Sequence, residues 1–222
     1  MNKATASSPV PSEPPADTGR IYGGESLAER RARRRQQFLD AGLDVFGTTG
    51  YRTATVRQLC RQAELTDRYF YESFDGIEDL LMAVYTWQFS LIQRDVRAVL
   101  EAQAAPTDPL AAAHAALDAL YARAEDPRVA RVCWLEVLGV SPRVDQMYNA
   151  TFEGFSALTI AFARRVRPDW QLEPEETRML GMAVVGAVSQ TVTYWVMGGH
   201  KEQRTSLVAA TARVFQGVLS TL

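Results

Sequence analysis

Apolar residues recur every three or four positions from about residue 27 to the end of the chain, which predicts helices and no convincing strand. Residues 38–46 carry the apolar face of a first helix, which Gly47 and Gly50 are expected to close. A second, short helix is predicted over residues 56–63, where apolar residues stand at i, i+3, i+4 and i+7. Thr66 is an N-cap candidate for a third short helix. We therefore expect an all-α fold.

The helices predicted beyond residue 76 are longer than the first three. Proline and glycine mark their ends, because proline is tolerated in the first turn of a helix and glycine commonly follows the last. The expected ranges are about 78–104, 110–125, 127–138, 142–166, 175–197 and 201–222. A small N-terminal group of helices is thus followed by a larger helical body.

Residues 1–26 differ from the rest of the chain in composition. They combine several prolines with Ser, Thr, Ala and Gly and contain almost no large apolar residue, so they cannot bury enough surface to offset the loss of chain entropy. We expect a disordered tail, and the absence of an apolar core segment argues against a signal peptide. The chain accordingly divides into residues 1–26, 27–76 and 77–222.

The distribution of charge is more informative than the formal net charge of -2. Residues 30–71 contain nine arginines and four acidic residues, so this segment carries +5 and the rest of the chain -7. A basic segment joined to a larger acidic body suggests that the segment meets a polyanion such as nucleic acid. The alternative is that these charges only solvate helix surfaces.

The residue types that build active sites are scarce. Two cysteines (Cys60 and Cys133) and two histidines (His114 and His200) leave no disulfide framework and no metal-binding cluster. The sequence has no Gly-rich phosphate loop, no His-Glu-x-x-His and no nucleophile elbow. We therefore expect no catalytic residue, no metal and no cofactor, and a cytoplasmic protein that is not an enzyme.

Residues 179–199 form an uncharged run of 21 residues, which is long enough to span a bilayer. Ser, Thr, Gln and Gly within this run lower its hydrophobicity, and no basic cluster flanks it. The last helix places one further stripe on a single face: Leu207, Ala210, Thr211, Val214, Val218 and Leu222. Two adjacent apolar faces at the end of a chain are typical of an intersubunit bundle. We predict a homodimer interface here and no membrane.

The first three helices carry the clearest functional signal. Two short helices joined by a tight turn and supported by a preceding helix form a helix-turn-helix, whose second helix fits a DNA major groove about 12 Å wide. The residues that match a known pattern are Phe38-Leu39-Asp40-Ala41, Phe46, Gly50-Tyr51, Thr55-Val56, Leu59, Ala63, Leu65-Thr66, Tyr71, Phe74 and Leu80-Leu81. In these residues the chain resembles the TetR family of bacterial transcriptional regulators, over residues 33–84 and without gaps.

The resemblance implies a function for each part of the chain. It implies a homodimer that binds a palindromic double-stranded DNA operator, usually as a repressor that a small-molecule ligand releases. Residues 27–76 would be the helix-turn-helix DNA-binding domain, and residues 77–222 the ligand-binding and dimerisation domain. The helix that leads from Glu78 is the direct covalent link between them and would transmit ligand binding. The alternative is a helical small-molecule- or partner-binding protein without operator binding.

The helix-turn-helix departs from the family pattern in two places, at the start of its first helix and in its turn. Ala54 stands where a helix-starting threonine is usual, so Thr53 or Thr55 must cap instead. Glu64 replaces the usual turn glycine. This replacement suggests either a turn without a positive φ or a strained one.

The expected recognition helix, residues 66–74, is acidic. Asp67 and Glu72 fall where lysine and histidine are frequent, which leaves this helix a net charge of -1. An acidic helix weakens non-specific attraction to DNA, so the arginines of residues 30–35, with Arg52 and Arg57, would have to supply the phosphate contacts.

Ten residues are candidates for DNA contact: Arg33, Arg34, Thr55, Arg57, Thr66, Asp67, Arg68, Tyr69, Tyr71 and Glu72. Arg68 and Tyr69 are the expected base readers, since arginine forks onto guanine and tyrosine meets a thymine methyl group. Tyr71 is expected to contact phosphate. Asp67 or Glu72 would either accept from a cytosine amino group or restrain a neighbouring arginine, and the sequence leaves both open.

The body offers candidates for a ligand site: Trp134, Glu136, Tyr148 and Phe152. An aromatic stripe along the helix of residues 142–166 is also what a plain hydrophobic core would contain. Glu136 is unusual because its neighbours are apolar, so we expect it to pair with an arginine such as Arg94 or to orient a polar ligand. The ligand is expected to be a largely apolar small molecule, whose identity the sequence does not give.

Overall fold

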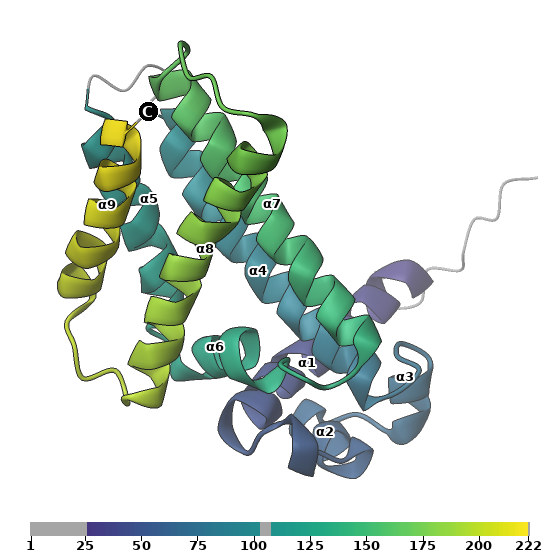
Figure 1. The fold of residues 1–222 in the computed structure, drawn as a ribbon. Coiled ribbons are helices and arrows are strands. Elements are labelled where there is room, and N and C mark those ends of the chain that lie inside the picture. Colours follow the sequence, from purple (N-terminus) through teal and green to yellow (C-terminus); the bar gives the residue numbers. More distant parts are fainter. Residues whose placement is uncertain (1–25, 103–107, 222) are drawn as a thin grey trace, which may run out of the picture.

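The computed structural model describes residues 26–102 and 108–221, and every regular element within these ranges is helical (Figure 1). The N-terminal unit contains α1 (Leu27–Thr48), the 3₁₀ turn η1 (Tyr51–Thr53), α2 (Val56–Ala63) and α3 (Asp67–Tyr71). The body contains α4 (Ile77–Ala102), α5 (Pro109–Ala124), α6 (Pro127–Arg131), the π-helical turn η2 (Val132–Glu136), α7 (Pro142–Val166), α8 (Pro174–Met197) and α9 (Arg204–Thr221). The all-α prediction is confirmed. The tail expected over residues 1–26 lies outside the described residues, apart from Ser26.

The first helix begins well before its apolar face. Ser26 and Glu29 form a capping box, in which each side chain accepts a hydrogen bond from the backbone N–H of the other residue. The arginine-rich residues 30–35 therefore occupy the first turns of α1, and most of their side chains are exposed. The apolar residues within 38–46 are buried in the core, as the apolar pattern predicts, whereas Asp40 is exposed.

Three phenylalanines bring α1 and α3 together. The ring centroids of Phe38 and Phe70 lie 5.4 Å apart, and those of Phe38 and Phe74 lie 6.2 Å apart, both in edge-on geometry. Leu80 and Leu81 of α4 are fully buried in the same core. Full burial of such a side chain stabilises the fold by about 1.5–3 kcal/mol, so these contacts hold the short third helix in place.

Helix α4 belongs to both units. It packs against α1 at its start and against α5 and α7 along the rest of its length (Figure 1). Helix α9 packs on α5, and α8 lies against α7 and α9. Ile92 of α4 and Tyr121 of α5 are fully buried, which places the core of the body between these helices.

Helix α6 crosses α1 at close range. A Cβ atom at Gly47 would lie 2.5 Å from the Cα atom of Arg128, which is closer than side-chain and backbone atoms approach in folded proteins. Gly47 therefore lies inside α1, at the crossing with α6, and the prediction that it closes the helix is wrong. Gly50, at φ 95°, begins the turn after the helix, as its lack of a side chain allows.

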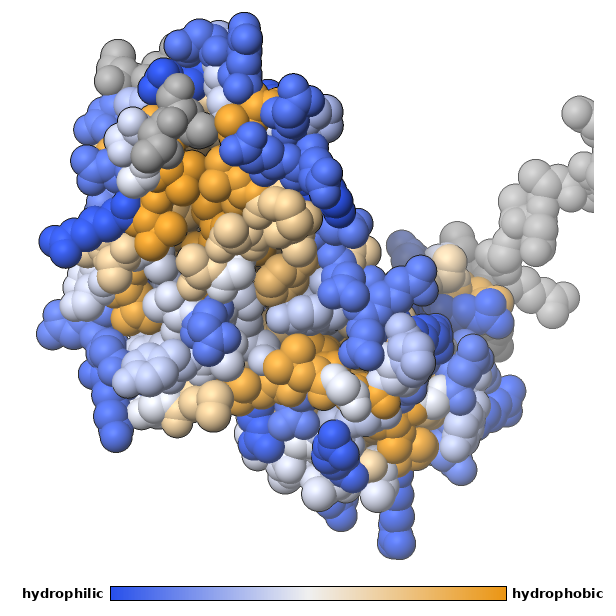
Figure 2. Space-filling model, in the orientation of Figure 1, coloured by the Kyte–Doolittle hydropathy of each residue, from blue (hydrophilic) through white to orange (hydrophobic). Residues whose placement is uncertain are grey.

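Only some residues of the predicted apolar stripe on α9 face the core of the protomer. Leu207 and Thr211 are buried within the protomer, whereas Ala210 and Val214 are exposed. On α8, Met179, Tyr194 and Met197 are exposed. Figure 2 shows apolar side chains gathered where α8 and α9 meet, with hydrophilic side chains around them.

By length and composition alone, α8 could cross a membrane. The face of α8 opposite the exposed residues carries Val184, Val188, Val192 and Trp195, and all four side chains are buried. Core packing therefore explains the apolar residues on this face of α8, whereas only 28% of its 18-residue apolar stretch is buried within the protomer.

We predict that Gly47→Ala destabilises the protein by about 1–3 kcal/mol, because α1 and α6 must separate to admit the methyl group. The measurement is urea unfolding at a fixed protomer concentration. Gly154→Ala in α7 is the control, since its nearest neighbour to a new Cβ would lie 3.8 Å away. The control should gain up to about 1 kcal/mol from helix propensity. Equal effects at the two positions would contradict the close crossing.

Candidate DNA-binding surface and ligand cavity

The helix-turn-helix starts at a threonine cap. The Thr55 hydroxyl accepts a hydrogen bond from the backbone N–H of Gln58 at 3.2 Å, so Thr55 is the N-cap of α2. The Thr53 hydroxyl instead donates to the Thr49 carbonyl at 3.0 Å. Of the two threonines that the sequence left open, Thr55 is the cap.

The turn between α2 and α3 is left-handed at Glu64. This residue has φ 54° and ψ 35°, and the backbone N–H of Leu65 donates to the Cys60 carbonyl at 3.0 Å behind it. A turn without a positive φ was one of two expectations and is wrong. The αL conformation costs a residue with a side chain roughly 1–2 kcal/mol, which makes this turn the strained alternative.

Helix α3 presents a short and mixed surface. It ends at Tyr71, three residues before the expected end, because Glu72 forms the C-cap. Thr66 holds the N-cap position without a side-chain hydrogen bond, and Asp67 accepts from the backbone N–H of Arg68 at 2.9 Å. The side chain of Arg68 is 83% exposed and Tyr71 is 62% exposed, so both face solvent.

Glu72 lies among arginines. Its carboxylate accepts from Nε of Arg68 at 3.1 Å and lies 3.8 Å from a guanidinium nitrogen of Arg34. Of the two roles that the sequence left open for Glu72, this geometry is that of restraining a neighbouring arginine. The pairing also removes part of the positive charge next to the recognition surface.

Two arginines of α1 support α3. The guanidinium of Arg34 stacks 4.3 Å from the ring centroid of Tyr69, and its side chain is only 15% exposed. Tyr69 is half-buried beneath it. Arg35 donates to the Ser73 carbonyl at 2.8 Å and stacks on Phe74, a role that the sequence analysis missed. Arg34 and Tyr69 thus lie against each other, whereas Arg33 and Arg57 have exposed side chains.

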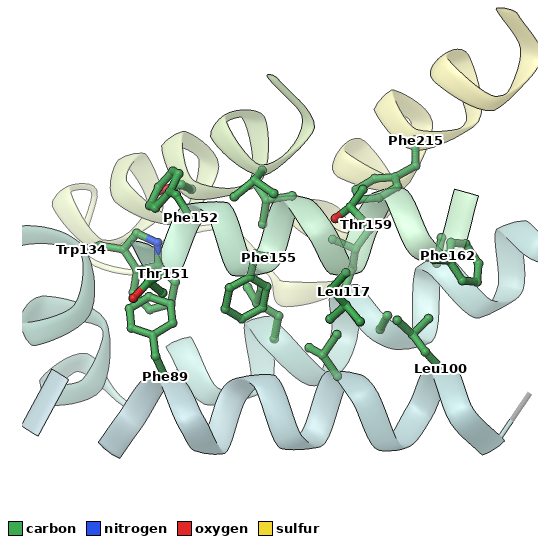
Figure 3. Close-up of a pocket in the computed structure, with 18 residues that line it drawn as sticks. Phe89, Leu100, Leu117, Trp134, Thr151, Phe152, Phe155, Thr159, Phe162 and Phe215 are labelled. Atoms are coloured by element: carbon green, nitrogen blue, oxygen red, sulfur yellow. The ribbon is translucent and has the colours of Figure 1, made fainter. Parts of the chain in front are cut away.

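A cavity of about 90 Å³ runs through the body between α4, α5, α7, α8 and α9 (Figure 3). Phe89 and Trp134 lie at one end, and Leu100 and Phe162 lie at the other. Between Thr151 and Phe162 the cavity follows twelve residues of α7, which rise by about 16 Å. Its walls are aromatic and aliphatic apart from the hydroxyls of Thr151, Thr159 and Ser189.

Two of the four expected ligand residues line this cavity. Trp134 and Phe152 are in its wall, whereas Tyr148 and Glu136 are not. Tyr148 packs behind Phe152, with ring centroids 4.6 Å apart, and burial raises the pKa of its hydroxyl. The sequence analysis missed most of the wall, including Phe89 of α4 and Phe215 of α9, because neither belongs to the stripe on α7.

Glu136 lies at the junction between the body and the N-terminal unit. The expectation that Glu136 pairs with an arginine is confirmed, but the partner is Arg131; Arg94, which was given as the example, pairs with its neighbour Asp95 at 2.9 Å. Glu136 accepts from Nε of Arg131 and from the backbone N–H of Tyr51, both at 2.7 Å. Its side chain is 13% exposed. The neighbours of Glu136 in the sequence are apolar, but its carboxylate binds the backbone of Tyr51 in the N-terminal unit.

A second ion pair joins the same two units. Arg128 of α6 hydrogen-bonds to Asp44 of α1 and to Asp126. The hydrogen bond from the Arg128 side chain holds the pKa of the Asp126 carboxyl below its usual range. This contribution to stability is present above the unfolded pKa and is lost as the pH falls through the lowered value.

Residues 38–84 match the family model of bacterial regulatory proteins, tetR family. The chain is 24% identical over 185 residues to the fatty acid metabolism regulator protein of Bacillus subtilis (strain 168), covering 83% of this chain and 93% of that protein. It is 26% identical over 204 residues to the HTH-type transcriptional activator FasR of Mycolicibacterium smegmatis, covering 90% of each.

Two solved structures have the same fold. The fatty acid degradation regulator FadR from Bacillus halodurans gives a TM-score of 0.70 at 22% identity, over 82% of this chain and 93% of that one. FadR from Bacillus subtilis, in complex with stearoyl-CoA, gives a TM-score of 0.69 at 20% identity, over 81% of this chain and 96% of that one.

We predict that Glu64→Gly stabilises the protein by about 1 kcal/mol, because glycine adopts the αL conformation without the steric cost. Thermal unfolding would measure the gain. Glu64→Ala is the matched control, since it removes the same charge but keeps a Cβ atom. If the alanine variant were stabilised as much as the glycine variant, the backbone would not be the cause.

Proposed function

Because this chain is a DNA-binding transcriptional regulator of the TetR family, we propose that it represses transcription from a palindromic operator until a long-chain acyl ligand enters the body. Residues 27–76 bind the operator, and residues 77–222 bind the ligand and form the homodimer. The observation that carries this proposal is the long apolar cavity, which lies in the same chain as an exposed recognition helix.

The chemistry of the cavity selects the ligand class. No charged side chain is among its wall residues, so the part of the ligand that enters must be uncharged. Each buried methylene group of an acyl chain contributes about 0.8 kcal/mol to binding. A charged head such as coenzyme A would stay outside the apolar wall. The ligand of the Bacillus subtilis FadR structure, stearoyl-CoA, has this division into an apolar chain and a charged head.

The acidic charge of α3 favours a second candidate function. Glu72 pairs with Arg68 and lies near Arg34, which reduces the attraction of α3 for phosphate. A helical protein that binds a ligand or a protein partner without an operator would need no such attraction. DNA binding by the purified protein decides between the two functions.

The function is tested by titrating the protein onto the DNA upstream of its own coding sequence, with scrambled DNA beside it. Palmitoyl-CoA should release the operator, whereas coenzyme A without the acyl chain should leave it bound. Binding of every duplex with equal affinity would reject a sequence-specific regulator and leave the partner-binding function. Release by coenzyme A alone would reject the acyl ligand.

Phosphate contacts and base contacts should respond differently to substitution. Arg57→Ala should weaken binding to operator and scrambled DNA alike and lower the salt slope by about one. Arg68→Ala should cost about 1–3 kcal/mol on the operator and much less on scrambled DNA. Salt titrations with both duplexes measure the two effects. An equal loss on both duplexes for Arg68→Ala would make it a phosphate contact.

The homodimer is proposed to form through the exposed faces of α8 and α9. Val214 is 43% exposed beside other apolar side chains, so a carboxylate there would be buried without a partner in the dimer. Val214→Asp should sediment as a monomer at micromolar concentration. Ala98→Asp, on an exposed position of α4, adds the same charge and should remain a dimer. A monomeric wild type would contradict the interface.

Filling the cavity should abolish the response to ligand without abolishing DNA binding. Ala116 of α5 is in the cavity wall, so Ala116→Trp would occupy the space of the acyl chain. Palmitoyl-CoA should then bind at least tenfold more weakly. Ala111→Trp, at an exposed position of the same helix, is the control. Unchanged palmitoyl-CoA affinity in Ala116→Trp would place the ligand elsewhere.

A further inference from the structure

One short segment touches both the cavity and the helix-turn-helix unit. Trp134 and Glu136 are two residues apart on η2. The Trp134 side chain is buried in the cavity wall, with its ring centroid 5.3 Å from that of Phe89. The Glu136 carboxylate accepts from the backbone N–H of Tyr51, in the turn that leads into α2. A movement at one of these side chains must pass through a single π-helical turn to reach the other.

Residues of the N-terminal unit pack closely around Glu136 and its partner Arg131. Arg131, which pairs with Glu136, also donates to the Thr48 carbonyl at 2.7 Å. A Cβ atom at Gly50 would lie 2.9 Å from a guanidinium nitrogen of Arg131 and 3.2 Å from the Glu136 carboxylate. One Glu136 carboxylate oxygen accepts from Arg131 and the other accepts from the Tyr51 backbone N–H. Because Gly50 packs against both side chains, the turn around Gly50 depends on the position of Glu136.

The cavity wall must move when a ligand enters. The cavity of about 90 Å³ is smaller than the roughly 300–1,000 Å³ of common ligand sites, so an acyl chain has to displace wall side chains. Trp134 is the wall residue contributed by η2. A π-helical turn contains one residue more than an α-helical turn of the same rise, and such turns recur at functional sites. Displacement of Trp134 therefore changes the turn that also holds Glu136.

We propose that Glu136 is the positioning residue through which the cavity acts on the helix-turn-helix. Outward displacement of Trp134 rearranges η2 and withdraws the Glu136 carboxylate from the Tyr51 amide. The crossing of α6 and α1 at Gly47, with the ion pair between Arg128 and Asp44, stays in place as the pivot. The N-terminal unit then rotates about this crossing. The step that assigns the displacement to an acyl ligand rests on the proposed function; the coupling between wall and turn does not.

The test reads the Tyr51 amide directly, by hydrogen exchange of the full-length protein. Glu136→Ala removes the acceptor and should speed exchange at Tyr51 about tenfold or more. Trp134→Ala should do the same from the cavity side, and Trp134→Phe is the milder variant if the alanine protein does not fold. Phe215→Ala, in the cavity wall but on α9, should leave the Tyr51 amide unchanged.

An internal reference separates this effect from a loss of overall stability. The backbone N–H of Leu59 donates to the Thr55 carbonyl at 3.0 Å, at the start of α2 in the same unit. Faster exchange at Tyr51 with unchanged exchange at Leu59 supports the proposal. Equal acceleration at both amides, or an unchanged Tyr51 amide in both Trp134 variants, overturns it.

A second measurement connects the contact to ligand response. In the wild type, saturating palmitoyl-CoA should speed exchange at Tyr51 and change operator affinity by a factor in the usual range of about 5–150. Glu136→Ala should bring that factor close to one, whereas Glu153→Gln, which removes the same charge from an exposed position of α7, should keep it. An undiminished factor in Glu136→Ala overturns the proposal. Failure of palmitoyl-CoA to bind, with Tyr51 still accelerated by Trp134→Phe, rejects the proposed ligand and supports the coupling.

Discussion

The close crossing of α1 and α6 is the constraint on which the relation between the two units depends. Gly47 admits the backbone of α6 to a distance that no side chain would allow, and Arg128 secures the crossing through Asp44. The DNA-binding unit is therefore attached to the body covalently, through residues 72–76 between α3 and α4, and also by non-covalent contacts, of which this crossing is the tightest in packing. A sequence reading finds only the first attachment, because the second joins residues more than eighty positions apart.

The charge around α3 depends on which arginines of α1 are held against aromatic rings. Arg34 and Arg35 stack on Tyr69 and Phe74, so two of the five arginines within residues 30–35 support the position of α3. A guanidinium over an aromatic ring contributes about 0.5–1 kcal/mol at exposed sites. Arg31, Arg33 and Arg57 have exposed side chains, and Glu72 pairs with Arg68. Under the proposed function, such a surface would favour a matched operator over bulk DNA, because the non-specific part of the affinity would be small.

The helix pattern could be predicted from the sequence because it depends on local spacing and on caps such as Ser141 and Thr55. The cavity could be predicted only in part. Trp134 and Phe152 stand out as aromatics on predicted helices, but Phe89 and Phe215 become neighbours through helix packing, which periodicity does not encode. Glu136 was recognised as unusual, yet its partner Tyr51 contributes a backbone N–H, and no side-chain pattern reveals such a donor. Likewise, the left-handed Glu64 follows from the turn geometry and not from the preference of glutamate.

The small volume of the cavity sets how much ligand the protein needs. If only a minor fraction of molecules is open at any moment, the apparent dissociation constant equals the intrinsic one divided by that fraction. Under the proposed function, the side chains that close the cavity between α4 and α7 would raise the ligand concentration at which the regulator responds, in addition to the intrinsic affinity that the ligand contacts set. Exchanging one core residue for a smaller one would make the same protein a more sensitive detector, at the cost of packing energy. Evolution can thus adjust the threshold of such a regulator without changing either its ligand or its operator.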